Sequence, residues 1–235
     1  MSAIAGMVNL DGAPIDPATV TRMAARLGAR APDGTVVWCE GSAALIHGQF
    51  SVTPESEDER QPLADTASGL VISFDGRLDN RPELLDALAI DPEAGDAALT
   101  LGAYRMWGEA AAAHLLGDFA FAIWDSTERR LVCGRDTTGV RTLFYRVGRG
   151  WIAWASAIDI LAAGVNPLPA PNEGMVGEYL TGIVTDKHET LFQDIYRVPP
   201  AHVLVASGRG HATTTSATPA ARAGIAVISR DDGRG

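Results

Sequence analysis

Ser2 is the first residue of this 235-residue chain with a side chain able to carry out chemistry. A small second residue favours removal of the initiator methionine, which would leave Ser2 with a free α-amine beside its hydroxyl. An N-terminal serine, threonine or cysteine can use its own amine as the general base in a nucleophilic attack. Many intracellular proteins begin with Met-Ser without using the serine, so Ser2 predicts this chemistry only together with other residues.

A carboxylate, a backbone N–H group and a guanidinium occur side by side at Asp75, Gly76 and Arg77. They follow a short apolar run, residues 70–72, of the kind that a buried strand shows. Asp-Gly tolerates positive φ, so it predicts a tight turn after this strand, with the three polar groups presented together. For an isolated Asp-Gly, the simplest interpretation is a hairpin turn with no further role.

The elements that position these groups are short strands and helices in irregular alternation. Apolar or alternating runs indicate strands at residues 2–10, 36–39, 43–47, 70–72, 116–125, 131–136, 139–146, 151–156 and 201–205. Helices are indicated at 16–27, 82–88, 96–107, 158–163 and 176–180. Asp16 is suited to cap the first helix, with Pro17 in its first turn. This order predicts an α+β layered domain with antiparallel sheets.

The composition changes after about residue 206. Residues 211–235 contain no aromatic side chain and are rich in Ala, Thr, Arg and Gly. We therefore expect a folded body at residues 1–206 and a disordered tail at residues 207–235.

Charge and composition disfavour several classes of function. The formal net charge is −10 and the pI is near 4.9, which disfavours nonspecific nucleic-acid binding and leaves no polybasic patch for a membrane surface. No signal peptide or membrane-length apolar run occurs, so a cytoplasmic protein is expected. Cys39 and Cys133 are far apart and belong to no Cys/His cluster, so no metal site is expected and both are predicted to be buried free thiols.

Short motifs follow one another in a specific order along nearly the whole body. They are Ile4-Ala5-Gly6, Arg30-Ala31-Pro32-Asp33, His47-Gly48-Gln49-Phe50-Ser51, Phe74-Asp75-Gly76-Arg77-Leu78-Asp79-Asn80, Gly95-Asp96, Gly134-Arg135-Asp136, Gly139-Val140-Arg141 and Trp154-Ala155-Ser156. No single motif is decisive, but the ordered set resembles the N-terminal, glutaminase-type domain of asparagine synthetases, a class II glutamine amidotransferase domain.

This resemblance implies a fold and a reaction. The fold is the four-layer αββα sandwich of N-terminal-nucleophile hydrolases. In active members, a cysteine after the initiator methionine attacks the side-chain amide of glutamine, passes through an oxyanion and releases ammonia. The ammonia is then used by a C-terminal, ATP-dependent synthetase domain. In this chain, the resemblance makes Ser2 the nucleophile candidate, and Asp75 and Gly76 the oxyanion site.

The chain departs from the family where the chemistry is most demanding. Ser2 stands where the family has cysteine, and a hydroxyl is a poorer nucleophile than a partly ionised thiol. Asp75 replaces the asparagine whose amide N–H₂ group helps to bind the oxyanion. An ionised carboxylate donates no hydrogen bond and repels the developing negative charge. Loss of one such donor costs about 2.7–4 kcal/mol in enzymes where it has been tested.

The residues expected to bind glutamine differ as well. Arg77 replaces the family glutamate that contacts the α-ammonium group, and Gln49 replaces the arginine that pairs with the α-carboxylate. Only Asp96 remains from the amino-acid-binding set. One hypothesis is that Asp75 and Arg77 form a hydrogen-bonded pair that fills the vacated pocket.

The sequence at 74–80 resembles the version found in family members that no longer use glutamine, such as β-lactam synthetases and the cyclases of lasso peptides. There the domain is a structural partner of a synthetase domain that uses ATP and Mg²⁺. The pyrophosphate loop of that domain, Ser-Gly-Gly-x-Asp-Ser, is not recognisable here, since Ser207-Gly208-Arg209-Gly210 lacks most of it. Truncation or a change of reading frame near residue 207 would explain this absence.

Three functions remain open from the sequence. The first is a degenerate, non-catalytic glutaminase-like domain of a ligase of the lasso-peptide-cyclase type, with no cofactor of its own. Its partner would be a synthetase domain in cis or in trans, with a peptide as a further candidate partner. The second is an active amidohydrolase that uses Ser2 to supply ammonia for asparagine synthesis. The third is a stand-alone ligand-binding protein.

Overall fold

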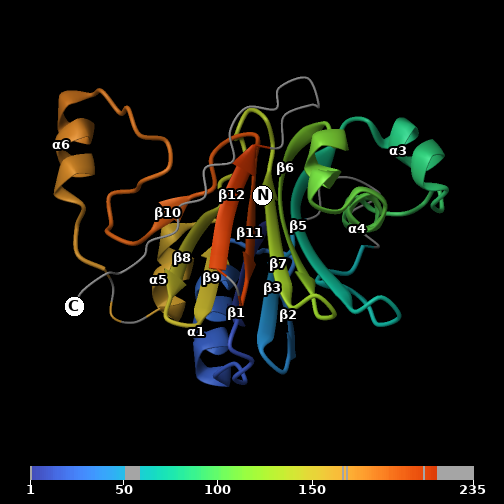
Figure 1. The fold of residues 1–235 in the computed structure, drawn as a ribbon, viewed down its shortest axis with the longest axis horizontal. Helices are drawn as coiled ribbons and strands as arrows, with labels where there is room; N and C mark the ends of the chain where they lie inside the picture. The colour runs from blue at the N-terminus through green and yellow to red at the C-terminus, as the bar shows by residue number, and fades with distance from the viewer. Residues whose placement is uncertain (1, 51–58, 166, 168, 209, 216–235) are drawn as a thin grey trace.

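Two six-stranded antiparallel sheets form the centre of the protein, seen in a computed structural model that describes residues 2–50, 59–165, 167, 169–208 and 210–215 (Figure 1). The first sheet has the order β10-β8-β9-β1-β3-β2, and the second has the order β12-β11-β7-β6-β5-β4. The strands of the first sheet are β1 (Ala3–Asn9), β2 (Thr35–Glu40), β3 (Ala43–Gly48), β8 (Phe144–Gly148), β9 (Trp151–Ala155) and β10 (Tyr196–Arg197). Those of the second sheet are β4 (Leu63–Asp65), β5 (Leu70–Leu78), β6 (Gly117–Asp125), β7 (Arg130–Arg135), β11 (His202–Ser207) and β12 (Gly210–Thr215).

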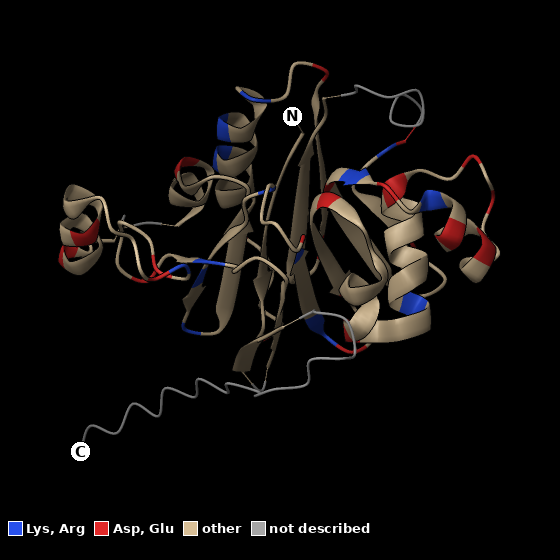
Figure 2. Cartoon of the chain, turned by 90° about the horizontal axis from the view of Figure 1, so that it is seen from above, with Lys and Arg blue, Asp and Glu red and all other residues tan. Residues whose placement is uncertain are grey.

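Helices lie on the outer side of each sheet, so the order of layers is helix, sheet, sheet, helix (Figure 2). The helices on the first sheet are α1 (Pro17–Gly28) and α5 (Ile158–Gly164). Those on the second sheet are α3 (Arg81–Leu88), α4 (Asp96–Trp107) and the 3₁₀ helix η1 (Gly108–His114). One further helix, α6 (Glu173–Thr181), stands apart from both sheets (Figure 1). The predicted α+β, four-layer αββα architecture is confirmed.

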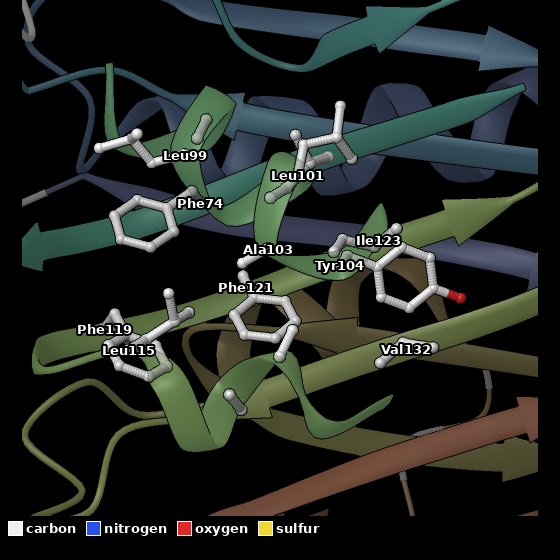
Figure 3. Close-up of a cluster of buried hydrophobic side chains, with 14 of the residues drawn as sticks. Phe74, Leu99, Leu101, Ala103, Tyr104, Leu115, Phe119, Phe121, Ile123 and Val132 are labelled. Atoms are coloured by element: carbon white, nitrogen blue, oxygen red, sulfur yellow. The ribbon is translucent and has the colours of Figure 1, made fainter. Parts of the chain in front are cut away.

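The hydrophobic cluster on the outer face of the second sheet joins alternate residues of its strands to buried residues of α4. Phe74 of β5 and Phe121 of β6 point away from the other sheet, toward Leu99 and Leu101 of α4 (Figure 3). Alternate residues of the same strands, such as Val71, point the opposite way, because successive side chains of a strand lie on opposite faces. Both faces of this sheet are therefore buried.

A second cluster fills the layer between the two sheets. Ile4 of β1 and Leu45 of β3 come from the first sheet, and Val71 of β5 and Leu204 of β11 come from the second. Strands β1 and β3 lie directly across this layer from β5. Ser73 and Asp75, on the same face of β5 as Val71, therefore point between the sheets.

The first helix begins as the sequence predicts. The Asp16 carboxylate accepts a hydrogen bond from the N–H group of Ala18 at 3.0 Å, and Pro17 occupies the first helical position. Val20, Met23 and Leu27 form the buried face of α1. The remaining predicted helices are also present, with shifts of a few residues at their ends.

The hairpin turn predicted at Asp75-Gly76 is wrong. Strand β5 runs without interruption through both residues, and Gly76 pairs with Phe119 of β6 in an unbroken register. Glycine is needed there for another reason: its φ is +149°, and a Cβ atom at this position would lie 2.1 Å from the carbonyl oxygen of Asp118. The positive-φ signal was real, but it reflects close contact between two strands rather than a turn.

Two smaller expectations also need correction. The sheet continues past residue 206, because β12 pairs with β11 between residues 210 and 215; the rest of the expected tail, residues 216–235, lies outside the described residues. Cys133 is buried as expected, but Cys39 is exposed on the edge strand β2. In the part of the chain that is described, no helix has the length and apolar character needed to cross a membrane.

Candidate functional site

Ser2 lies immediately before β1, beside Phe50, the second residue after the neighbouring strand β3. Its Oγ accepts a hydrogen bond from the backbone N–H of Phe50 at 3.2 Å and lies 3.4 Å from the Phe50 carbonyl oxygen. Gln49, one of the expected glutamine-binding residues, precedes Phe50, and its backbone N–H donates to the carbonyl of Gly34 at 2.8 Å. The hydroxyl of Ser2 and the backbone of Gln49 therefore belong to one end of the first sheet.

Asp75 points into the layer between the sheets. It lies on β5 two positions beyond Ser73 and pairs with Ala120 of β6, which belongs to the inter-sheet cluster. Only 4% of Asp75 is exposed, and its Oδ1 atom has no hydrogen-bond partner. Burial raises the pKa of Asp75 to about 6, although the nearby Arg141 guanidinium acts to lower it.

Among the described residues, Asp75 forms an ion pair with Arg141, which the sequence analysis did not select as a site residue. Nη1 of Arg141 lies 3.7 Å from Oδ1 of Asp75, close enough for an ion pair but too long for a hydrogen bond. Both Nη1 and Nε of Arg141 are buried without a hydrogen-bond partner. The available signal was the Gly139-Val140-Arg141 motif, but nothing in the sequence indicates which strand this arginine faces.

A rigid loop positions Arg141. The Asp136 carboxylate accepts hydrogen bonds from the backbone N–H groups of Val140 and Arg141, each at 3.1 Å. The Arg135 guanidinium donates to the carbonyl oxygens of Arg141 at 2.6 Å and Val198 at 2.7 Å. Arg135 and Asp136 therefore fix this turn together. These bonds also explain why β8 begins at Phe144 rather than at residue 139, where the sequence predicted a strand.

The hypothesis that Asp75 pairs with Arg77 is wrong. Nε of Arg77 donates instead to Oδ1 of Asp79 at 2.8 Å, and both of these side chains are more than half exposed. Arg77 lies near the end of β5, where the side chain reaches solvent, while Asp75 lies two residues deeper in the sheet. The two charges flanking Gly76 therefore have separate partners.

Asp96, the residue that remained from the amino-acid-binding set, is already engaged. It lies in the first turn of α4, where its Oδ2 accepts a hydrogen bond from the Leu78 N–H at 2.9 Å. Its Oδ1 forms an ion pair with Arg81, which also donates to the carbonyl of Ala94. The role of Arg81 was missed because it lies at the start of a different helix, α3.

Two more buried polar groups face the layer between the sheets. His47 of β3 lies opposite Ile4, and its Nδ1 atom has no hydrogen-bond partner. Burial lowers the pKa of His47 to about 4, so the ring is neutral at physiological pH. Ser73 of β5 is fully buried, and its Oγ is also unpartnered. We call His47, Ser73, Asp75 and Arg141 the polar cluster, because each has a buried side-chain atom without a hydrogen-bond partner and Asp75 contacts Arg141.

The polar cluster is unusual because buried polar groups are nearly always hydrogen-bonded, and each exception costs about 1–3 kcal/mol. Such exceptions are typical of sites that hold water or a ligand. The chemistry available to the cluster depends on pH: Asp75 is an anion beside Arg141 at neutral pH and a neutral carboxylic acid at pH values well below 6. No group of three or more potential metal-binding side chains occurs among the described residues.

Comparison with known proteins gives a consistent result. A family model described as a glutamine amidotransferase domain matches residues 1–216. Asparagine synthetase (glutamine-hydrolyzing) 3 of Bacillus subtilis is 30% identical over 199 residues, which cover 82% of this chain and 32% of that protein. Amidase chry2 of Gibberella zeae is 26% identical over 188 residues, which cover 75% of this chain and 26% of that protein. The chain thus spans about a quarter to a third of these relatives.

Solved structures extend the same result to the fold. The chain is similar to the glutamine phosphoribosylpyrophosphate amidotransferase of B. subtilis, solved with ADP and GMP, with a TM-score of 0.62 and 15% identity. It also resembles a structure described as the allosteric regulatory enzyme of purine biosynthesis, with a TM-score of 0.65 and 15% identity. Each match covers 92% of this chain and 49% of the other. At this identity the likeness supports the N-terminal-nucleophile-hydrolase fold alone.

Proposed function

The chain belongs to the glutamine amidotransferase domain family and is related to asparagine synthetases, and we propose that it is a non-catalytic member of this family. The observation that carries the proposal is Asp75. Its carboxylate points between the sheets and forms an ion pair with Arg141 at 3.7 Å. At neutral pH, this position offers a negative charge where an amidase needs a hydrogen-bond donor for its oxyanion.

The state of Asp96 supports the same proposal. An α-ammonium group would need a free carboxylate, but Asp96 already pairs with Arg81 and accepts the Leu78 N–H. Arg77, at the second position expected to contact this ammonium group, carries a positive charge. Binding glutamine would therefore require breaking one ion pair and placing two cations together, while the expected site offers no free carboxylate in compensation.

We propose further that the domain serves as the structural partner of an ATP-dependent synthetase domain, present in cis or in trans. Two relatives are glutamine-hydrolyzing asparagine synthetases about three to four times as long as the part they share with this chain. ATP and Mg²⁺ would be bound by that partner. In the version closest to lasso-peptide cyclases, an amine already present in a peptide substrate would attack the activated carboxylate, so no ammonia would be required.

Ammonia release from glutamine tests the loss of catalysis. We expect the purified chain to release no more ammonia at pH 7.5 than its Ser2→Ala variant. Ammonia release by the wild-type chain that disappears in Ser2→Ala would contradict the proposal and establish an amidohydrolase using Ser2. Because Asp75 becomes neutral at lower pH, the assay should also be run near pH 5.5, where a protonated carboxyl group could donate a hydrogen bond.

The unpartnered atoms of the polar cluster favour one second candidate, a ligand-binding domain. A small molecule that donates to Asp75 and accepts from Arg141 would satisfy atoms that now lack partners. A ligand that binds only the folded state raises the apparent melting temperature. A thermal-shift screen with amino acids and short peptides tests this candidate, with Asp75→Asn and Arg141→Met as controls that should abolish the shift.

A further inference from the structure

Helix α6 and the loop after it form an arm, residues 171–194, that projects from the body. Figure 1 shows α6 standing away from both sheets, joined to the rest of the chain near β10. Met175 is buried, but no residue of α6 belongs to any of the three hydrophobic clusters that hold the layers together. The body packs without this helix.

The arm carries an unusual concentration of exposed apolar side chains. Of eleven large hydrophobic residues exposed among those described, five lie on it: Tyr179, Leu180, Ile183, Val184 and Leu191. Leu180 is 79% exposed and Ile183 is 66% exposed. Single exposed apolar residues are common, but four within six positions of the chain concentrate exposed apolar surface, which is typical of interaction sites. We call these four residues, Tyr179, Leu180, Ile183 and Val184, the patch.

The patch is held in a defined shape. The Asn172 side chain caps the start of α6 by accepting the Met175 N–H, and Gly182 ends the helix in a left-handed conformation with φ +74°. Beyond Gly182, the chain returns to the helix, where the Glu178 carboxylate accepts bonds from the Thr185 N–H at 2.8 Å and the Thr185 hydroxyl at 2.6 Å. Tyr179, Leu180, Ile183 and Val184 lie inside this closed segment. A partner would therefore meet an ordered surface and lose little entropy in binding it.

Acidic side chains outnumber basic ones on the arm. Residues 171–194 contain five acidic residues and one basic residue, Lys187. The acidic residues are Glu173, Glu178, Asp186, Glu189 and Asp194. Figure 2 shows that the charged positions of α6 are all acidic. A second copy of the arm would bring like charges together, so this charge disfavours pairing of the arm with itself.

We propose that the arm is a docking surface for a different protein domain, one that offers an apolar groove bordered by lysine and arginine. The apolar patch enters the groove, and the acidic side chains of the arm set the orientation and exclude acidic competitors. This inference rests on the proposed function, and the domain that carries the groove is then the synthetase-type partner. Leu180 and Ile183, the most exposed aliphatic residues of the arm, are the expected centre of the contact.

Binding to a separately produced partner tests the proposal. The probe is the part of B. subtilis asparagine synthetase 3 that follows its match to this chain. Binding is measured by calorimetry at low and at ~0.5 M salt. We expect the double variant Leu180→Ser/Ile183→Ser to bind about tenfold more weakly or worse, because central apolar contacts supply most of the affinity. The matched control is Met106→Ser/Leu116→Ser, two residues of similar exposure on the body, which should bind like the wild type.

Each outcome is decisive. Failure of the wild type to bind, or equal binding by Leu180→Ser/Ile183→Ser, overturns the proposal. Binding that does not weaken at high salt would contradict the proposal that lysine and arginine border the groove. Ultracentrifugation of the chain alone provides a third check, since self-association that requires Leu180 would assign the surface to a second copy instead. The glutamine assay is independent: ammonia release with intact arm-dependent binding would reject the loss of catalysis but keep the docking surface.

Discussion

Replacing Asp75 with asparagine should stabilise the protein at neutral pH but not in acid. Asparagine has nearly the same shape, and its Oδ1 can still face Arg141, so packing is preserved. What changes is the cost of holding a charge in the layer between the sheets. The pKa of Asp75 is raised from its ordinary value of 3.8 to about 6, mainly by burial. The folded state therefore holds the proton more tightly than the unfolded state.

The direction of the pH effect follows from this difference. Well below pH 3.8, Asp75 is protonated in both the folded and the unfolded state, so it adds no pH dependence to the free energy of unfolding. As the pH rises to about 6, the unfolded state gains by ionising first, and the free energy of unfolding falls. The full loss is about 3 kcal/mol, taking about 1.36 kcal/mol per tenfold change in the equilibrium. Above about pH 6 the loss stays constant, and Asp75→Asn removes it.

Urea unfolding of both proteins, near pH 4 and near pH 7.5, measures this effect. Relative to the wild type, Asp75→Asn should gain about 2.4 kcal/mol between the two pH values, because the unfolded wild type is already partly ionised at pH 4; any constant effect of the substitution cancels. Asp79→Asn is the matched control, since Asp79 is an exposed carboxylate paired with Arg77. An equal difference between Asp75→Asn and wild type at both pH values would show that burial does not raise the pKa of Asp75, and would refute this reasoning.

Three further predictions follow from the same contacts. Gly76→Ala should destabilise the protein by about 3 kcal/mol or more in urea unfolding, because the new Cβ would lie 2.1 Å from the Asp118 carbonyl oxygen. Gly174→Ala is the control and should not destabilise the protein, because a Cβ atom there makes only an ordinary contact. Asp136→Ala should lower the free energy of unfolding by about 3 kcal/mol, because backbone N–H groups of the loop lose their acceptor. Asp136→Asn should lose less, because its amide oxygen can still accept some of these hydrogen bonds. Equal losses in the two variants would contradict this explanation. Because burial lowers the pKa of His47 to about 4, the free energy of unfolding should fall by about 3 kcal/mol as the pH falls from 6.5 to 4. Urea unfolding of His47→Leu should not show this fall.

Much of the fold could be predicted from the sequence because its signals are local. Alternation of apolar residues located most strands, and Asp16 with Pro17 located the start of α1. The ordered motifs indicated the αββα architecture. The Asp75-Gly76 turn was wrong because Asp-Gly reports only that positive φ is tolerated, and the same signal serves a glycine where two strands approach closely.

The partners of the site residues could not be predicted because they depend on tertiary contacts. Arg141 reaches Asp75 across 66 residues of sequence, and Arg81 reaches Asp96 from a different helix. Glu178 holds the exposed patch only because the chain turns back at Gly182. The sequence at 176–180 indicates a short helix, but not that the side chain of Leu180 faces solvent rather than the core.

The loop between β7 and β8 joins strands of different sheets, and it delivers Arg141 to a carboxyl group on β5. Arg135 and Asp136, which hold the backbone of Arg141, lie at the end of β7 in the same sheet as Asp75. The second sheet therefore fixes both members of the ion pair. A partner that moved this loop would change the acidity of Asp75 without touching it, because Arg141 lowers the pKa of that carboxyl group.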